Sequence, residues 1–258
     1  MKIALQLYSC RDKIILYEDP RKALKQISEM GYDGVEFFNV DGQTPYGTLE
    51  PQVIREALEE SGLEGLNVHL HLPLEKWFGN LEREFSYARE VGLRAVSFPY
   101  LAPELRSTDL YRRLIDQFPE IVRQCREYGL EFVYHNHDFE MDPGMGSPML
   151  LEALTRPDGV RLELDTFWAF FKGKDPCALM EQMGEKLKYI HIKDYHKLSD
   201  FYSMRFTAIG TGRMDNQAIL NQAVKMQLPW VIVEQDNSEM DTLESARLSA
   251  ENLRKMMG

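Results

Sequence analysis

The chain of 258 residues is long enough to bury a full hydrophobic core, so neither a disulfide nor a structural metal is needed for stability. Its formal net charge of −11 argues against nucleic acid or an anionic membrane as a partner, because both are bound through basic surfaces. The three cysteines (Cys10, Cys125 and Cys177) lie far apart, which is typical of free thiols in a reducing compartment. The N-terminal segment is too short and polar for a signal peptide, and we expect a cytoplasmic location.

Short apolar or β-branched runs alternate with longer amphipathic stretches along the chain. The runs predicted as strands are Ile3–Tyr8, Gly34–Phe38, Gly65–Leu70, Ala95–Pro99, Glu131–Tyr134, Gly159–Leu164, Tyr189–Ile192 and Trp230–Glu234. The stretches predicted as helices include Arg21–Met30, Pro51–Ser61, Leu81–Val91, Asp109–Tyr128 and Leu243–Met256. Glycines that can adopt the left-handed conformation follow four of them, namely Gly31, Gly62, Gly92 and Gly129.

Eight strands that alternate with helices and start roughly 30 residues apart predict an α/β fold, a (β/α)8 TIM barrel. We expect a single domain over residues 1–258. Two doubly wound domains are the main alternative. That alternative is disfavoured because no G-x-G-x-x-G motif follows the first strand and no linker divides the chain.

A TIM barrel carries its functional residues at the C-terminal ends of its strands. Five of the six histidines occur at predicted strand ends, namely His69, His71, His135, His137 and His191. Asp165 and Glu234 end the sixth and eighth strands, and Glu36 lies in the second. Any one of these residues alone could be a turn former or a hydrogen-bonded structural group. Polar groups at the same end of four successive strands instead predict a functional site.

Residues two apart on a strand share a face. The pairs that do so here are His135 with His137, Glu163 with Asp165, and His191 with Lys193. Imidazole and carboxylate groups form a mixed nitrogen and oxygen site, which suits Mn²⁺, Co²⁺, Fe²⁺ or Zn²⁺ better than Mg²⁺. We therefore expect one divalent metal ion, with coordination positions open toward the barrel mouth.

Eight motifs resemble segments of the xylose isomerase-like barrel superfamily, which includes sugar phosphate isomerases and epimerases, keto-inositol dehydratases and abasic-site endonucleases. The motifs are LQLYSCRD, GYDGVEFF, VHLHLP, FVYHNHDFEM, LELDTFWA, YIHIKD, AIGTGRMD and VIVEQD. The resemblance implies that Asp165, His191 and Glu234 are metal ligands. It also implies a fourth ligand at the end of the fifth strand, where the family has a Glu and this chain has His135.

The departure at His135 bears on the reaction. In the family's epimerases, the fifth-strand and eighth-strand Glu residues face each other across the substrate and move a proton on either side of one carbon. That pair is missing here, and YHNH resembles the corresponding segment of the keto-inositol dehydratases. Glu140, a few residues on, could restore a carboxylate to the site.

The resemblance implies a metal-dependent isomerase or epimerase that acts on a small sugar or keto-sugar through an enediolate, with dehydration as the alternative on the same site. A divalent ion polarises the substrate carbonyl, and Glu234 or His137 removes the neighbouring proton. Lys193 is expected either to stabilise the oxyanion or protonate a leaving hydroxyl, or to form an ion pair with a neighbouring carboxylate.

Four further residues are expected to contact the substrate. Glu36, His69 and His71 are candidates for hydrogen bonds to sugar hydroxyls, and Trp168 for an apolar wall beneath a sugar ring. The Gly210–Arg213 stretch could bind a phosphate, although a plain turn is the simpler interpretation. The alternatives are a non-catalytic sugar-binding barrel and, disfavoured by the net charge of −11, an abasic-site endonuclease. A homo-oligomer is left open.

Overall fold

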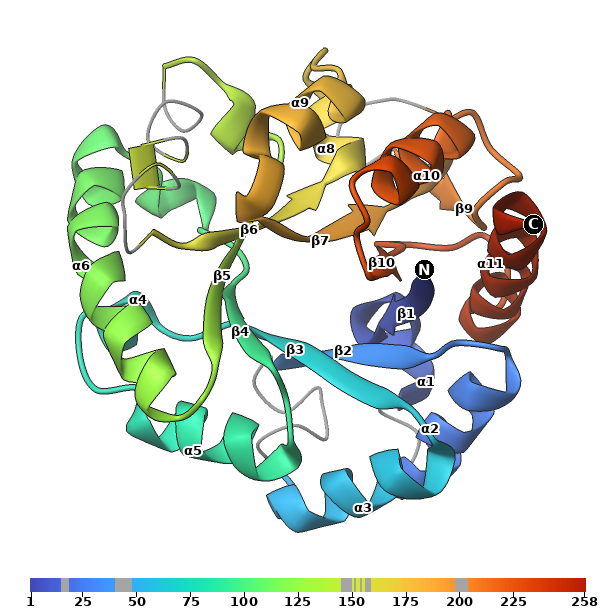
Figure 1. The fold of residues 1–258 in the computed structure, drawn as a ribbon, viewed down its shortest axis with the longest axis horizontal. Coiled ribbons are helices and arrows are strands. Elements are labelled where there is room, and N and C mark those ends of the chain that lie inside the picture. The colour runs from blue at the N-terminus through green and yellow to red at the C-terminus, as the bar shows by residue number, and fades with distance from the viewer. Residues whose placement is uncertain are drawn as a thin grey trace.

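The computed structural model describes residues 1–14, 19–39, 48–144, 150, 152–153, 155, 159–197 and 204–258. Eight parallel strands close into a barrel in the order β1-β10-β7-β6-β5-β4-β3-β2, and helices surround it (Figure 1). The predicted TIM barrel is therefore confirmed. Its strands are β1 Lys2–Gln6, β2 Gly34–Asn39, β3 Glu64–Leu70, β4 Ala95–Phe98, β5 Glu131–His135, β6 Arg161–Asp165, β7 Leu187–Ile192 and β10 Trp230–Val233.

The helices pack on the outside of the barrel. They are α1 Arg11–Ile14, α2 Pro20–Glu29, α3 Pro51–Ser61, α4 Leu74–Trp77, α5 Glu82–Val91, α6 Thr108–Glu127, α8 Thr166–Phe171, α9 Pro176–Met183, α10 Asn216–Lys225 and α11 Thr242–Met257. The five predicted helices agree with α2, α3, α5, α6 and α11 to within one residue at each end. The four glycines predicted to follow helices have φ angles between 71° and 95°. Within the described ranges, no helix is both long and apolar enough to cross a bilayer.

The predicted strands agree with the structure to within two residues at each end, and two of the differences have a clear local reason. The first strand ends at Gln6 rather than Tyr8, because Gln6 Oε1 accepts the Tyr8 N–H at 3.1 Å and the chain turns into a 3-10 helix, Leu7–Cys10. In addition, β8 (Asp194–Lys197) and β9 (Arg205–Thr207) form an antiparallel hairpin outside the barrel. Strands this short do not show the alternation from which a strand can be predicted.

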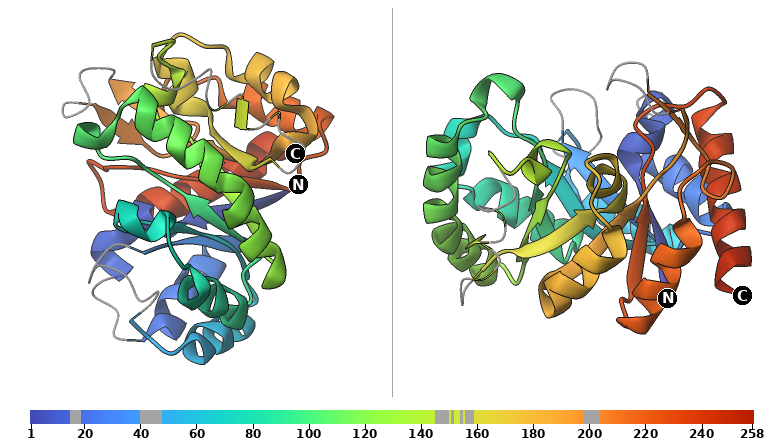
Figure 2. Two further views of the ribbon diagram at one scale, coloured as in Figure 1. Left: turned by 90° about the vertical axis from the view of Figure 1, so that its left-hand side faces the viewer. Right: turned by 90° about the horizontal axis from the view of Figure 1, so that it is seen from above.

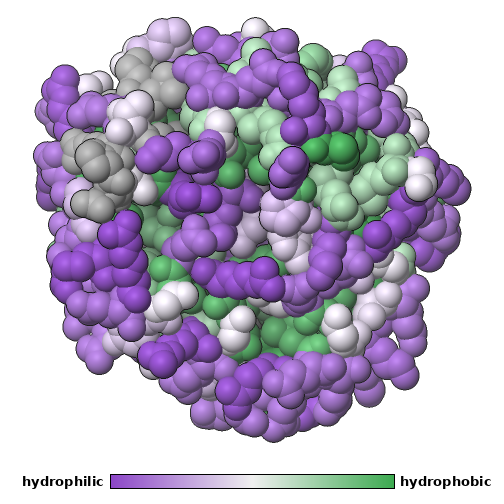
Figure 3. Space-filling view, in the orientation of Figure 1, coloured by the Kyte–Doolittle hydropathy of each residue, from purple (hydrophilic) through white to green (hydrophobic). Residues whose placement is uncertain are grey.

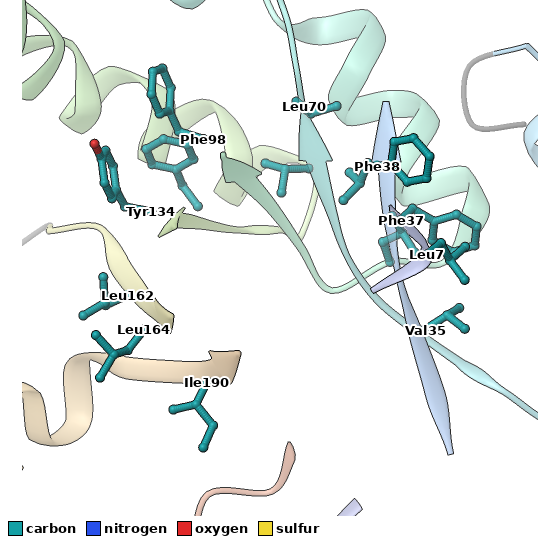
Figure 4. Packing of buried hydrophobic residues seen from close by; sticks show 14 of the residues in the cluster. Leu7, Val35, Phe37, Phe38, Leu70, Phe98, Tyr134, Leu162, Leu164 and Ile190 are labelled. Carbon is teal, nitrogen blue, oxygen red and sulfur yellow. The ribbon is translucent and has the colours of Figure 1, made fainter. Parts of the chain in front are cut away.

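The buried apolar residues of the described chain form three clusters, two of which build the barrel itself. Outward-facing strand residues, among them Val35, Phe37, Leu162 and Leu164, pack in the larger cluster between barrel and helices (Figure 4). Inside the barrel, a second cluster fills the end at which the strands begin; it comprises Ala4, Leu66, Ala95, Val133, Tyr189, Trp230 and Ile232. Farther along the strands, the inward-facing residues become polar, so the functional site lies at the opposite end of the barrel.

Both termini lie at one end of the barrel in the side views (Figure 2). Strand β1 starts at that end, and Lys2 pairs there with Trp230 at the start of β10. Seen in the orientation of Figure 1, hydrophilic side chains surround the molecule and apolar ones show between them (Figure 3). The helices therefore present polar outer faces while their apolar faces cover the barrel.

Candidate metal centre and substrate pocket

The parallel register brings the expected metal ligands together. His135 on β5 lies beside Glu163 on β6, and Asp165 on β6 lies beside His191 on β7. Glu234 directly follows β10, which pairs with β7. One potential ligand atom from each of His135, Asp165, His191 and Glu234 lies within 4.8 Å of the others, and all four residues are buried. Among the described residues, these four therefore form a site that can hold a metal ion.

Asp165 divides its two carboxylate oxygens between the fold and the site. Its Oδ1 caps helix α8 by accepting the N–H groups of Phe167 at 2.9 Å and Trp168 at 3.1 Å. Its Oδ2 lies 3.0 Å from the Lys193 ammonium and 3.9 Å from His135 Nε2. Burial raises the pKa of Asp165 to about 6. The cap thus aims one oxygen of this residue into the cluster.

Lys193 is fully buried among three carboxylates. Its Nζ lies 3.0 Å from Asp165 Oδ2, 2.9 Å from Glu234 Oε2 and 2.8 Å from Asp236 Oδ2. Burial alone would lower the pKa of Lys193, but the three carboxylates outweigh burial and raise the pKa well above its ordinary value. Of the roles considered for this residue, the ion pair is the one present in the structure, and Lys193 does not line the pocket described below.

A second layer of buried charge lies deeper in the barrel. Glu163 Oε2 is 2.6 Å from His69 Nε2 and 3.1 Å from His135 Nδ1, while Glu36 Oε2 is 2.7 Å from His191 Nε2. Burial and the charge of Glu163 raise the pKa of Glu36 to about 7. Burial lowers the pKa of His135 to about 3, so this imidazole is neutral near neutral pH.

A pocket of about 340 Å³ opens at this end of the barrel, at the small end of the usual range for small-molecule sites. Its lining residues are Tyr8, Phe38, His69, His71, Pro99, Tyr100, His135, His137, Glu234 and Asp236. Two of the expected substrate contacts, His69 and His71, are among them, but Glu36 and Trp168 are not. Glu36 is fully buried below the imidazoles, and Trp168 packs behind His137 at a ring-centroid distance of 5.9 Å.

Several residues of the site received no role from the sequence, among them Glu163, Asp236 and Tyr8. Their spacing carried a signal, since Glu163 precedes Asp165 by two residues and Asp236 follows Glu234 by two, which places each pair on one strand face. Tyr8 lies in the 3-10 turn after β1, so strand periodicity does not extend to it.

His137 and Glu140 occupy one turn after β5 but differ in position. His137 lines the pocket, and its buried Nδ1 has no hydrogen-bond partner within the described part of the chain. Burial lowers the pKa of His137 well below its ordinary value, which keeps the ring neutral. Glu140 instead accepts hydrogen bonds from Tyr134 Oη and from the His137 N–H, each at 2.8 Å. Glu140 therefore supports the turn that carries His137. It does not supply the carboxylate that the sequence predicted it would restore to the metal site.

The position of Glu140 predicts how stability changes with pH. Burial raises its folded-state pKa from 4.5 to about 7, so its contribution to stability is full below about pH 4.5 and is lost as the pH rises through about 7. Glu140→Gln cannot ionise, and it should be more stable than the wild type at about pH 8 by up to about 3 kcal/mol. Urea unfolding of both proteins at about pH 5 and pH 8 measures this difference, and an unchanged pH dependence in the variant would contradict it.

The glycine-containing turn after β9 binds a carboxylate of the chain itself. The Asp194 side chain accepts the N–H groups of Gly210 at 2.9 Å, Gly212 at 3.0 Å and Met214 at 2.9 Å. A Cβ atom at Gly212 would lie only 2.2 Å from Asp194 Oδ1, so the close approach requires glycine. The amides that could have bound a phosphate are therefore already paired.

Comparison with known proteins agrees with the fold. Residues 24–256 match the family described as Xylose isomerase-like TIM barrel. The inosose dehydratase of Geobacillus kaustophilus (strain HTA426) is 24% identical over 273 residues, covering 92% of this chain and 87% of that protein.

Two solved structures have the same fold. A sugar phosphate isomerase/epimerase from Parabacteroides distasonis ATCC 8503 is 22% identical with a TM-score of 0.78, covering 98% of this chain and 93% of that chain. The IolI protein with a bound zinc atom is 17% identical with a TM-score of 0.78, and the match covers 99% of this chain and 98% of that chain. The family match extends over residues 24–256, which is most of this chain, so the chain belongs to the xylose isomerase-like TIM-barrel family.

Proposed function

We propose that the protein holds one divalent metal ion through His135, Asp165, His191 and Glu234. The supporting observation is the charge of the buried cluster. Its buried carboxylates are Glu36, Glu163, Asp165 and Glu234, and the partly exposed Asp236 lies beside them. Lys193 is the permanently charged cation, in contact with Asp165, Glu234 and Asp236. Uncompensated buried charge is costly, and a divalent cation would offset it. The donor set suits Zn²⁺, Mn²⁺, Co²⁺ or Fe²⁺ better than Mg²⁺, and the IolI structure holds zinc.

The proposed substrate is a small keto-sugar or keto-polyol. The pocket volume of about 340 Å³ suits a single ring, and its walls combine aromatic side chains with imidazoles and carboxylates. The bound metal would supply Lewis-acid polarisation of the substrate carbonyl. The pairing of the Gly210, Gly212 and Met214 amides with Asp194 favours an unphosphorylated substrate, because the usual barrel phosphate site near the last strands is closed.

His137 is the group that we propose to remove the proton next to the carbonyl. It lines the pocket, its buried Nδ1 has no hydrogen-bond partner among the residues that the structure describes, and burial keeps the ring neutral, so it can accept a proton. Glu234 is the weaker candidate. Glu234 is itself a proposed metal ligand, and its Oε2 already lies 2.9 Å from both Lys193 Nζ and His191 Nδ1. Asp236 lines the pocket 2.8 Å from the Lys193 ammonium, so this pair is placed to pass a proton from Lys193 to a leaving hydroxyl while His137 holds the proton taken from carbon.

Dehydration and isomerisation both begin with removal of this proton. Dehydration is favoured by His135 at the fifth-strand position, because Glu234 then has no facing carboxylate for the two-sided proton exchange of an epimerase. The relatedness to inosose dehydratases over most of the chain points the same way. Isomerisation is the second candidate, since a shielded base such as His137 can return its own proton to the adjacent carbon.

A substrate test in deuterated water separates these reactions. Protein loaded with Zn²⁺, Mn²⁺ or Co²⁺ is incubated with an inosose and with matched phosphorylated and unphosphorylated ketoses, and the products are analysed by mass spectrometry and NMR. Loss of one water from the inosose is the expected result. A product isomeric with its ketose would support isomerisation instead. Binding of a sugar without turnover of any compound would contradict both and favour the non-catalytic barrel.

A further inference from the structure

Two carboxylates, Glu36 and Glu163, contact the rings of the proposed metal ligands but do not line the pocket. His135 has Nδ1 at 3.1 Å from Glu163 Oε2 and Nε2 at 3.9 Å from Asp165 Oδ2. His191 has Nε2 at 2.7 Å from Glu36 Oε2 and Nδ1 at 2.9 Å from Glu234 Oε2. Each ring thus has one nitrogen at the deeper carboxylate layer and the other nitrogen at the proposed metal site.

Other side chains hold these two carboxylates in place. Glu36 accepts hydrogen bonds from Gln6 Nε2 and Asn67 Nδ2, each at 2.7 Å. Glu163 Oε2 is bonded to His69 Nε2 at 2.6 Å, and Asn67 Nδ2 also reaches Glu163 Oε1 at 3.5 Å. Because their positions are set by groups outside the metal cluster, both carboxylates are preorganised to accept an imidazole N–H rather than to follow a metal ion.

We propose that Glu163 keeps the proton of His135 on Nδ1, and that Glu36 keeps the proton of His191 on Nε2. The lone pairs of His135 Nε2 and His191 Nδ1 are then presented to the metal ion. A carboxylate that accepts the second N–H of a ligand histidine fixes its tautomer and raises its basicity. Glu36 and Glu163 are thus positioning residues, and the inference rests on the metal site proposed above.

The tautomer of His135 can be read directly by imidazole ¹⁵N NMR on the metal-free protein. In the wild type, His135 should carry its proton on Nδ1. In Glu163→Gln the amide oxygen can still accept this proton, so the tautomer should persist. In Glu163→Leu the proton should move to Nε2, because the acceptor at Nδ1 is lost and the Asp165 carboxylate lies on the Nε2 side of the ring, 3.9 Å away. This readout does not depend on activity, and a merely structural role for Glu163 would not produce it.

Zinc affinity, measured by competition with a chromophoric chelator, is the second readout. The affinity should fall roughly 10-fold in Glu163→Gln and in Glu36→Gln, and roughly 100-fold in Glu163→Leu, the range typical for residues that orient a ligand. The matched control is Glu140→Gln, which alters a carboxylate with equally little exposure that bonds to Tyr134 Oη and a backbone N–H. Its zinc affinity should equal that of the wild type.

Several outcomes would overturn the inference. These are a wild-type His135 protonated on Nε2, or a folded Glu163→Gln protein that binds zinc as tightly as the control. An ion held by His69, His135, Glu163 and His191, the other group of described residues whose atoms could hold a metal, would also overturn it, because Glu163 would then be a ligand itself. A wild type that binds no divalent ion would overturn the metal site together with this inference, so the wild-type titration separates the two failures.

Discussion

Replacement of Lys193 by Met is expected to destabilise the metal-free protein by roughly 3–5 kcal/mol, the usual cost of removing one partner from a buried ion pair. The Lys193 ammonium is within 3.0 Å of Asp165, Glu234 and Asp236, and none of its surface is exposed. Without it, these carboxylates repel one another in a site from which water is largely excluded. Urea unfolding in the presence of a strong chelator measures the loss.

Lys188→Met is the matched control because Lys188 lies on β7, the strand that Lys193 directly follows, but its side chain points outside the barrel. Its Nζ is 2.6 Å from Glu131, whose side chain is 47% exposed, so this pair should contribute at most about 1 kcal/mol. Saturating Zn²⁺ should reduce the penalty of Lys193→Met, since the ion would neutralise Asp165 and Glu234. Equal destabilisation by the two lysine variants would contradict the role assigned to Lys193.

Asp165→Asn should weaken metal binding by more than the roughly 10–100-fold loss that is typical of residues that only orient a ligand. Asparagine preserves the cap of α8, because its side-chain oxygen can still accept the N–H groups of Phe167 and Trp168. What is lost is the negative charge at Oδ2. Metal content after dialysis, together with turnover of the keto substrate, should fall while the circular dichroism spectrum is unchanged.

Asp175→Asn provides the control for this variant. Asp175 is exposed and caps α9 in the same manner, accepting the N–H groups of Cys177 at 2.9 Å and Ala178 at 3.3 Å. The same substitution there should change neither metal content nor turnover. An Asp165→Asn protein that retains full metal content would show that Asp165 is not a ligand, whatever its effect on turnover.

The barrel, and the strand ends at which its polar residues gather, could be predicted from local sequence because both depend on short-range regularities. Strand periodicity places alternate residues on one face, so His135, Asp165 and His191 were expected to face inward from neighbouring strands. Glycines at helix ends likewise report a local backbone requirement, and the helix bounds were correct to within one residue. Parallel strands of a barrel end at one rim, which is why these residues could be expected to meet.

Which polar residues reach the pocket was decided only by the tertiary structure. Glu36 bonds to His191 across 155 positions of sequence, and a register shift at Leu162/Glu163 places Asp165 beside His191. Neither a shift in strand register nor a contact across the barrel can be predicted from a local sequence pattern. Glu140 bonds to the Tyr134 hydroxyl, and Lys193 pairs with three carboxylates. Buried polar groups must find such partners, and those of Lys193 come from other strands of the barrel. The sequence alone therefore determined the barrel and the end at which its polar groups gather, while packing decided which of them line the pocket and which support it from behind.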